Sequence, residues 1–146
     1  MATNFKRTIP NYLTFTFFLF FSCTLFGQTK VDKILSADKF YFLIETSGCF
    51  GGGADTITIV RQSSDSLTVF HKDQNGKIVT STIDQNQLLK FGETFKEKMN
   101  GERKCGCTLS STFVLSSKNG KTSFHTSCCG EELPSKTFRK LLNTYD

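Results

Sequence analysis

A chain of 146 residues with a formal net charge of +5, six cysteines and no tryptophan is short enough for a single domain. The positive charge is modest, and its lysines and arginines are interleaved with acidic residues, which excludes a nucleic-acid surface built on a basic cluster. The sequence has no internal repeat and no low-complexity tract, so we expect neither a repeat protein nor a disordered chain.

The first 27 residues have the pattern of a secretory signal peptide. Lys6 and Arg7 form a basic start, and the uncharged, mostly apolar residues 12–26 follow. An apolar segment of about 15 residues is shorter than the roughly 20 that a membrane-spanning helix needs. We therefore expect export to the periplasm, the outer envelope or the extracellular space. The alternative is an uncleaved N-terminal anchor.

Two cleavage sites compete within this leader. Cleavage after Gly27, a small residue, leaves a mature chain of about 119 residues with a formal charge of +3. Cleavage before Cys23 would produce a lipoprotein, although only Ser22 among the three preceding residues fits that pattern well. We expect the first, with Cys23 as the candidate for lipidation. Membrane contact is then expected only through the leader or such a lipid anchor.

Residues 28–37 are predicted to be a short tether, and residues 38–146 to form one folded domain. Branched and aromatic residues, or alternation of apolar and polar residues, predict four strands in the first half of this domain. They cover residues 38–46, 55–61, 66–72 and 77–83. The Asn-Gly pair at 75–76 is the strongest of the turn signals between them. These strands form a predicted meander.

A helix is predicted over residues 84–100. Asp84 is a suitable N-cap, with Gln87 at the capping-box position. Asn100 and Gly101 are typical of a helix end. Gly92 in the interior costs about 1 kcal/mol of helix stability relative to alanine.

A hairpin and a second helix follow. If Asn119 and Gly120 form the turn of a hairpin over residues 108–129, Leu115 lies opposite Phe124. Pro134 suits the first turn of a closing amphipathic helix. The order predicts an α+β fold: an antiparallel sheet made of a four-strand meander plus a hairpin, with two helices packed on one face.

The cysteines are predicted to form disulfides, because the leader directs the chain to an oxidising compartment. Five remain in the mature chain: Cys49, Cys105, Cys107, Cys128 and Cys129. Since five is odd, at most two bridges form, and one thiol stays free or joins two chains in a dimer. Cys128 and Cys129 point to opposite faces if they lie on a strand, so they need different partners. The connectivity stays open, and each bridge contributes about 2–4 kcal/mol.

A metal site is one alternative to disulfides. Four thiolates, from Cys105, Cys107, Cys128 and Cys129, match the ligand number of a structural zinc site and also suit copper(I). The Cys-x-Cys spacing is tighter than the usual zinc knuckle, so we expect no cofactor. His71 and His125 are more often ordinary strand residues than ligands.

The run Gly51, Gly52 and Gly53 directly follows Cys49 and Phe50. A phosphate-binding loop is excluded, because neither a lysine nor a helix follows these glycines. A catalytic Cys49 would need a nearby base such as His71 or His125, and no local signature supports one. We therefore predict a glycine-rich turn between two strands that a disulfide from Cys49 holds in place.

The layout resembles a small secreted bacterial envelope domain of unknown function. Its members carry a strand ending in C-[FY]-G-x-C-P, then V-x-V strands, a helix, a hairpin and a closing helix. Cys49, Phe50 and Gly51 match this motif, but Gly53 and Ala54 stand where the family has its second cysteine and proline. A local bridge from Cys49 is therefore ruled out. The resemblance implies a fold and brings no catalytic residues.

The leading functional prediction is an exported, non-enzymatic domain that binds a protein or an envelope component, or that inhibits an enzyme. It rests on export, small size and the lack of a recognisable catalytic motif. Two alternatives stay open: a thiolate protein that binds zinc or copper, and a cysteine-dependent enzyme that uses Cys49. Fold class alone does not decide among them.

Overall fold

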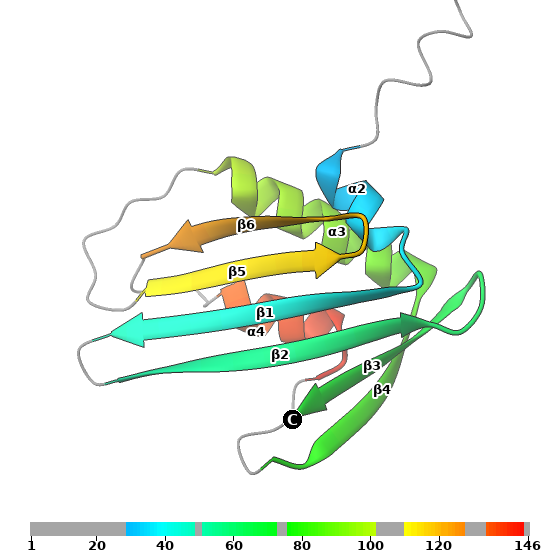
Figure 1. The fold of residues 1–146 in the computed structure, drawn as a ribbon, viewed down its shortest axis with the longest axis horizontal. Helices are drawn as coiled ribbons and strands as arrows, with labels where there is room; N and C mark the ends of the chain where they lie inside the picture. Colours follow the sequence, from blue (N-terminus) through cyan, green and yellow to red (C-terminus); the bar gives the residue numbers. More distant parts are fainter. Residues whose placement is uncertain (1–28, 49–50, 73–75, 102–109, 128–133, 145–146) are drawn as a thin grey trace, which may run out of the picture.

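The computed structural model describes residues 29–48, 51–72, 76–101, 110–127 and 134–144. These residues form six strands and three helices (Figure 1). In chain order the elements are α2 (Lys30–Leu35), β1 (Lys39–Gly48), β2 (Gly51–Arg61), β3 (Ser66–Lys72), β4 (Ile78–Asp84), α3 (Gln85–Asn100), β5 (Ser110–Ser117), β6 (Gly120–Thr126) and α4 (Pro134–Leu141).

All six strands belong to one sheet, with the order β4-β3-β2-β1-β5-β6 and antiparallel pairing throughout. The α+β prediction is therefore wrong: the chain has a mainly-β arrangement, in which strand residues outnumber helical ones. The reason is that β1 pairs on both sides, with β2 and with β5. This non-local pairing joins the meander and the hairpin into a single six-stranded sheet.

A third helix forms where a tether was expected. Oγ1 of Thr29 accepts a hydrogen bond from the backbone N–H of Asp32, and the Asp32 carboxylate accepts one from the backbone N–H of Thr29, which completes a capping box at the start of α2. Val31, Ile34 and Leu35 are buried in the core. Segment 28–37 therefore contains part of the folded unit.

The core lies between the sheet and the helices. In Figure 1, α3 and α4 lie behind the sheet, and α2 lies beside α3 near β6. Phe42 of β1 is at the centre of a phenylalanine cluster: its ring centroid is 5.1 Å from those of both Phe91 and Phe138, and 6.2 Å from that of Phe113. All four side chains are fully buried. These rings join α3 and α4 to the sheet.

The predicted N-cap of α3 is confirmed, because Asp84 and Gln87 form both hydrogen bonds of the capping box. Helix packing explains why a glycine occurs at position 92, inside α3. A Cβ added there would lie 2.7 Å from Cδ1 of Leu35, so glycine lets α3 approach α2 closely.

Two turn predictions need correction. The glycines at 51–53 lie inside β2 and pair with β1, so they are not the turn itself, whose residues 49–50 lie outside the described part of the chain. A Cβ on Gly52 would collide with the backbone oxygen of Thr46, so close strand approach, not unusual backbone angles, requires glycine there. The hairpin turns at Lys118 and Asn119, which places Phe124 opposite Phe113 instead of Leu115.

The segment after α4 is hydrogen-bonded to β4 at two points. Ser81 donates a hydrogen bond through Oγ to the backbone oxygen of Leu142 at 3.0 Å, and Asn143 donates one through Nδ2 to the backbone oxygen of Thr82 at 3.0 Å. Asn143 has φ = 52°, in the left-handed region typical of the residue that ends a helix.

Candidate functional site

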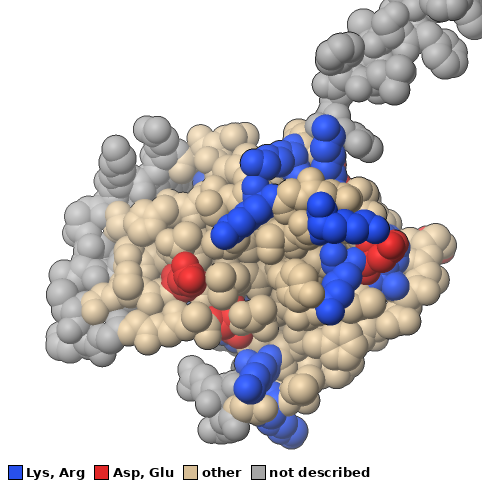
Figure 2. Space-filling view, in the orientation of Figure 1, with Lys and Arg blue, Asp and Glu red and all other residues tan. Residues whose placement is uncertain are grey.

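The face of the sheet opposite the phenylalanine core is covered by none of the described helices, and we call it the open face. Alternation along each strand sends every second side chain to it. Its members are Lys39, Tyr41, Leu43, Glu45, Thr56, Thr58, Val60, Thr68, Phe70, Lys72, Ile78, Thr80, Thr82, Thr112, Val114, Ser116, Lys121, Ser123 and His125. Figure 2 shows this face, with an uncharged centre.

One row of residues crosses the whole sheet through the middle of the open face. The strand register places Phe70 next to Thr58, Thr58 next to Tyr41, and Tyr41 next to Ser116. Tyr41 is 38% exposed and Phe70 is 36% exposed. Because neighbouring strands lie about 4.8 Å apart, the backbones that carry the two aromatic rings are separated by about 10 Å. The rings therefore flank a threonine on a broad surface.

Hydroxyl groups dominate the rest of this surface. Six threonines and two serines reach it from five of the six strands, all but β1: Thr56, Thr58, Thr68, Thr80, Thr82, Thr112, Ser116 and Ser123. Thr112 is hydrogen-bonded, through Oγ1, to Nδ1 of His125 at 3.2 Å. The hydroxyls of Thr58, Thr68 and Thr80 have no such partner within the described residues and are available to a ligand.

Positive charge gathers at the hairpin end of the open face (Figure 2). Lys39 begins β1 beside the strand that ends at Ser117, and Lys121 pairs with Ser116. The Nζ atom of Lys39 lies 5.2 Å from the centroid of the Tyr41 ring, a cation–π contact. Lys118 in the turn lies 3.6 Å from Asp38, and both side chains are largely exposed. The opposite charges of this pair cancel, so the excess positive charge at this end comes from Lys39 and Lys121.

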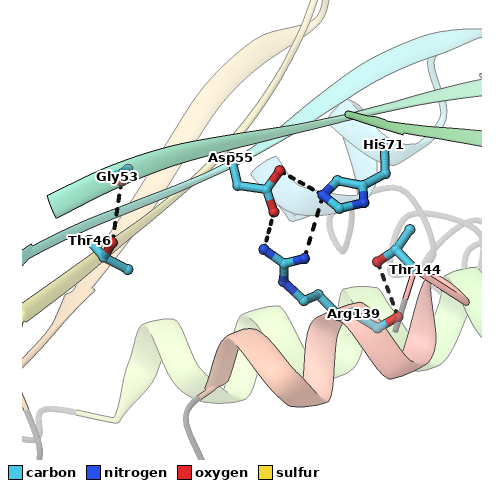
Figure 3. A network of polar contacts seen from close by, with 6 residues as sticks. All are labelled: Thr46, Gly53, Asp55, His71, Arg139 and Thr144. Carbon is cyan, nitrogen blue, oxygen red and sulfur yellow. Dashed lines mark hydrogen bonds and ion pairs between the residues drawn. The ribbon is translucent and has the colours of Figure 1, made fainter. Parts of the chain in front are cut away.

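A second polar group lies on the other side of the sheet and joins it to α4 (Figure 3). Asp55 of β2 contacts His71 of β3 through Oδ1 and Nε2 at 2.8 Å, and its other oxygen accepts a hydrogen bond from Nη2 of Arg139. Nη1 of Arg139 also lies 3.4 Å from Nε2 of His71. His71 is only 7% exposed.

This triad connects three elements of the fold: β2, β3 and α4. The described contacts of the His71 ring are Asp55 and Arg139, so its Nε2 either donates to the carboxylate or accepts from the guanidinium. No serine, threonine or cysteine hydroxyl or thiol among the described residues is hydrogen-bonded to that ring. Within the described part of the chain, a carboxylate and an imidazole are therefore hydrogen-bonded to each other with no nucleophile in contact with the ring.

The predicted cysteine sites, including Cys23 and the metal-ligand alternative, lie outside the described residues. The flanking strands, however, end at one place. Ser47 pairs with Ser110, and Ser111 pairs with Thr126, so the described residues next to Cys49, Cys107 and Cys128 lie at the same end of the sheet. Among the described side chains, no group of His, Cys, Asp and Glu forms a metal site.

The register also bears on a catalytic Cys49. His71 pairs with Ile57, whereas Gly51, which follows the segment holding Cys49, is six residues further along β2. At about 3.3 Å per residue, this separates the backbones of His71 and Gly51 by about 20 Å along the sheet. The His71 ring contacts Asp55, and Cys49 itself lies outside the described residues.

A shallow groove of about 340 Å³ lies between α2 and α3. Leu35, Leu88 and Leu89 line it together with Arg61 and Lys96. Three of its four charged lining residues already have partners. The guanidinium of Arg61 donates to Oε1 of Gln85 and to the backbone oxygen of Leu35, both at 3.1 Å, and Lys96 contacts Asp32 at 2.6 Å. The groove thus offers a ligand fewer unpaired polar groups than the open face does.

Comparison with known proteins adds no identity: no family model matches the chain, and no curated protein is similar to it. The resemblance to a secreted domain of unknown function therefore stays a prediction. No helix within the described residues is long and apolar enough to cross a membrane.

Sequence reasoning identified the alternation that builds the open face but did not treat that face as a site. The signal was present in the outward positions of four strands, where threonine recurs instead of charged residues. The triad of Asp55, His71 and Arg139 was missed, because its members lie 16 and 84 residues apart along the chain and no local motif connects them.

Proposed function

We propose that the protein is an exported, non-enzymatic binding domain that uses the open face of its sheet as the contact surface. The observation that carries this proposal is the composition of that face. A solvated face of an antiparallel sheet is common, but such a face usually carries charged side chains. Here Tyr41 and Phe70 lie at its centre, with Leu43 and Val60 beside them and only half buried.

The shape of the face supports contact with a large partner. Six strands give a broad surface without a deep cavity, whereas small-molecule sites are usually concave and enclosed. Exposed aromatic residues at the centre of a surface and charged residues at its rim are the usual anatomy of an interaction site. The partner on this proposal is an envelope or extracellular component.

Disulfides complete the proposal. The described strand ends next to the cysteine-bearing segments converge at one end of the sheet, and bridges between those segments would tie β1, β5 and β6 together there. Intact mass of the mature protein, before and after reduction and alkylation, tests this. Two bridges and cleavage after Gly27 are expected. Five reduced thiols with a retained zinc or copper ion would favour the metal-binding alternative instead.

The binding surface is tested by site-specific photo-cross-linking in the native host. A photoreactive amino acid replaces Tyr41 in one variant and Leu89, which is 54% exposed on α3, in the matched control. A high-molecular-weight adduct in the envelope fraction is expected from position 41 only. Adducts of equal yield from both positions, or none from position 41, would contradict the open face as the contact surface.

A further inference from the structure

We propose that the partner of the open face is an extended acidic polysaccharide. This inference rests on the proposed function, since it names the chemistry of the ligand for the same surface. It is argued from three properties of that surface: its flat aromatic rings, its hydroxyl groups and the sign of its charge.

The aromatic rings fit the apolar faces of sugar rings. Tyr41 and Phe70 stand on β1 and β3, on either side of Thr58, in the row that crosses the sheet. Both rings are exposed by more than a third. An aromatic ring offers a flat apolar surface at a small cost in side-chain entropy, and Tyr41 adds a polar hydroxyl. A chain of sugar rings laid along this row would contact both rings in succession.

The hydroxyl groups fit the polar edges of the same ligand. A sugar hydroxyl is both donor and acceptor, and so is each threonine hydroxyl. Thr58, Thr68 and Thr80 surround Phe70 on three strands, and no other described residue is hydrogen-bonded to their side chains. A partner with an apolar surface would leave these groups without hydrogen bonds, whereas a polysaccharide satisfies them.

The charge of the face selects an acidic chain. Lys39, Lys72 and Lys121 point to the open face, against Glu45. Two other acidic residues lie at its margins and already have partners: Asp84, which caps α3, and Asp38, which pairs with Lys118. Carboxylates on successive sugars would meet this positive field, which also speeds association at low ionic strength.

The same charges disfavour a second copy of the chain as the occupant. Packing two open faces together would bring six lysines and two glutamates into one interface, with an uncompensated positive charge in its interior. Burying charge without a partner is strongly unfavourable. A single anionic chain neutralises each face separately.

The test measures binding of the mature full-length protein by isothermal titration calorimetry to three polymers. These are polygalacturonate, which is an acidic polysaccharide; dextran, which is neutral; and poly-L-glutamate, which is acidic and has no sugar rings. We expect binding to polygalacturonate that weakens as salt rises, and affinities at least about tenfold lower for the other two.

Substitutions on and away from the open face test where the polysaccharide binds. Tyr41→Ser and Phe70→Ser should each weaken polygalacturonate binding by on the order of tenfold, and Lys121→Glu should weaken it and reduce its salt dependence. The matched controls are Leu89→Ser and Lys136→Glu on α3 and α4, which should leave the affinity unchanged. Circular dichroism of each variant checks that it is folded, and the polymer comparison on the unmodified protein does not depend on any variant.

Three outcomes would overturn the proposal. Equal binding to poly-L-glutamate would show that charge alone acts, and equal binding to dextran would show that charge is not used. No binding to polygalacturonate would exclude the ligand class. If the adduct from position 41 still forms in the envelope, that last result leaves the open face as a binding surface for a partner of another kind. If neither polygalacturonate binding nor the adduct from position 41 is observed, the proposed function is contradicted as well.

Discussion

The two faces of the six-stranded sheet are built from neighbouring residues and have opposite characters. Phe42 points to the covered face and is fully buried, whereas Tyr41, one position earlier, points to the open face and is 38% exposed. Val69 and Phe70 of β3 differ in the same way. The side chains of the covered face fill the space between the sheet and the helices. The open face carries aromatic rings and hydroxyl groups although none of the described helices packs on it. Because packing does not explain these side chains, we assign binding to this face.

The largest expected effect separates the two faces directly. Phe42→Ala removes a ring that contacts Phe91, Phe113 and Phe138, and should lower the free energy of unfolding by about 3–5 kcal/mol, because it leaves a cavity in the core. Tyr41→Ala should lower it by less than about 1 kcal/mol. Urea unfolding followed by circular dichroism measures both. Equal losses would mean that the open face is itself packed against other parts of the protein.

The triad below the sheet should give the next largest effect. Asp55→Ala leaves the guanidinium of Arg139 without its carboxylate partner in a partly buried position, and should cost about 2 kcal/mol of unfolding free energy. In a double-mutant cycle with Arg139→Ala, the coupling energy should exceed about 1 kcal/mol.

The exposed pair between Lys118 and Asp38 is the matched control for that cycle, and Asp38→Ala should change the free energy of unfolding by less than about 0.5 kcal/mol. A coupling near zero between Asp55 and Arg139 would show that the triad does not hold α4 on the sheet.

Alanine substitutions of two adjacent glycines at one end of the sheet should have different effects on stability. Gly52→Ala should destabilise the protein by about 1–2 kcal/mol, because its Cβ would collide with the backbone of Thr46, which cannot move without disturbing β1. Gly53→Ala should be nearly neutral, since its Cβ would only meet Oγ1 of Thr46 at 3.9 Å. Thermal unfolding of the two variants tests the pair, and an equal loss from both would instead indicate a general need for glycine there.

The smallest effect concerns α2 and depends on pH. Burial of the Asp32 carboxylate raises its pKa, but hydrogen bonds from Lys96 and Thr29 outweigh burial, so the pKa of Asp32 lies below its usual value. A lowered folded-state pKa stabilises the protein above the unfolded-state value, and this contribution disappears as the pH falls through the folded-state pKa.

We therefore expect Asp32→Asn to cost less than about 1 kcal/mol of unfolding free energy at neutral pH, where the partly exposed pair is screened by solvent, and progressively less as the pH falls through the folded-state pKa of Asp32. Chemical unfolding at neutral and at acidic pH gives the difference. A difference that is unchanged at low pH would show that the asparagine acts through the cap and not through charge.

Local signals predicted the individual elements well. Alternation located β3 at residues 66–72, and the capping box at Asp84 located the start of α3. The sheet as a whole was not predictable in the same way, because the pairing of β1 with β5 joins residues about 70 positions apart and leaves no local pattern. Helix α2 was missed although Thr29 and Asp32 form a capping box, since a six-residue helix depends on tertiary packing for its stability.

The candidate site was predictable only in part. The recurrence of threonine at outward positions could have suggested the open face, but the alignment of Phe70, Thr58 and Tyr41 in one row depends on the register of three strands. The lysines at the hairpin end come together only after β1 and β5 pair. The position of the hairpin turn decided which residues face each other in β5 and β6, and an error of one residue there shifted Phe124 from Phe113 to Leu115.

The contacts of Ser81 and Asn143 have a consequence for how the protein behaves at high concentration. An uncovered edge strand invites another chain to add to the sheet, which is the first step of strand-mediated aggregation. Asn143 occupies the backbone oxygen of Thr82 and Leu142 accepts a bond from Ser81, so the residues after α4 cover part of this edge strand. Loss of Asn143 would therefore leave one more backbone group of β4 open to pairing with another chain.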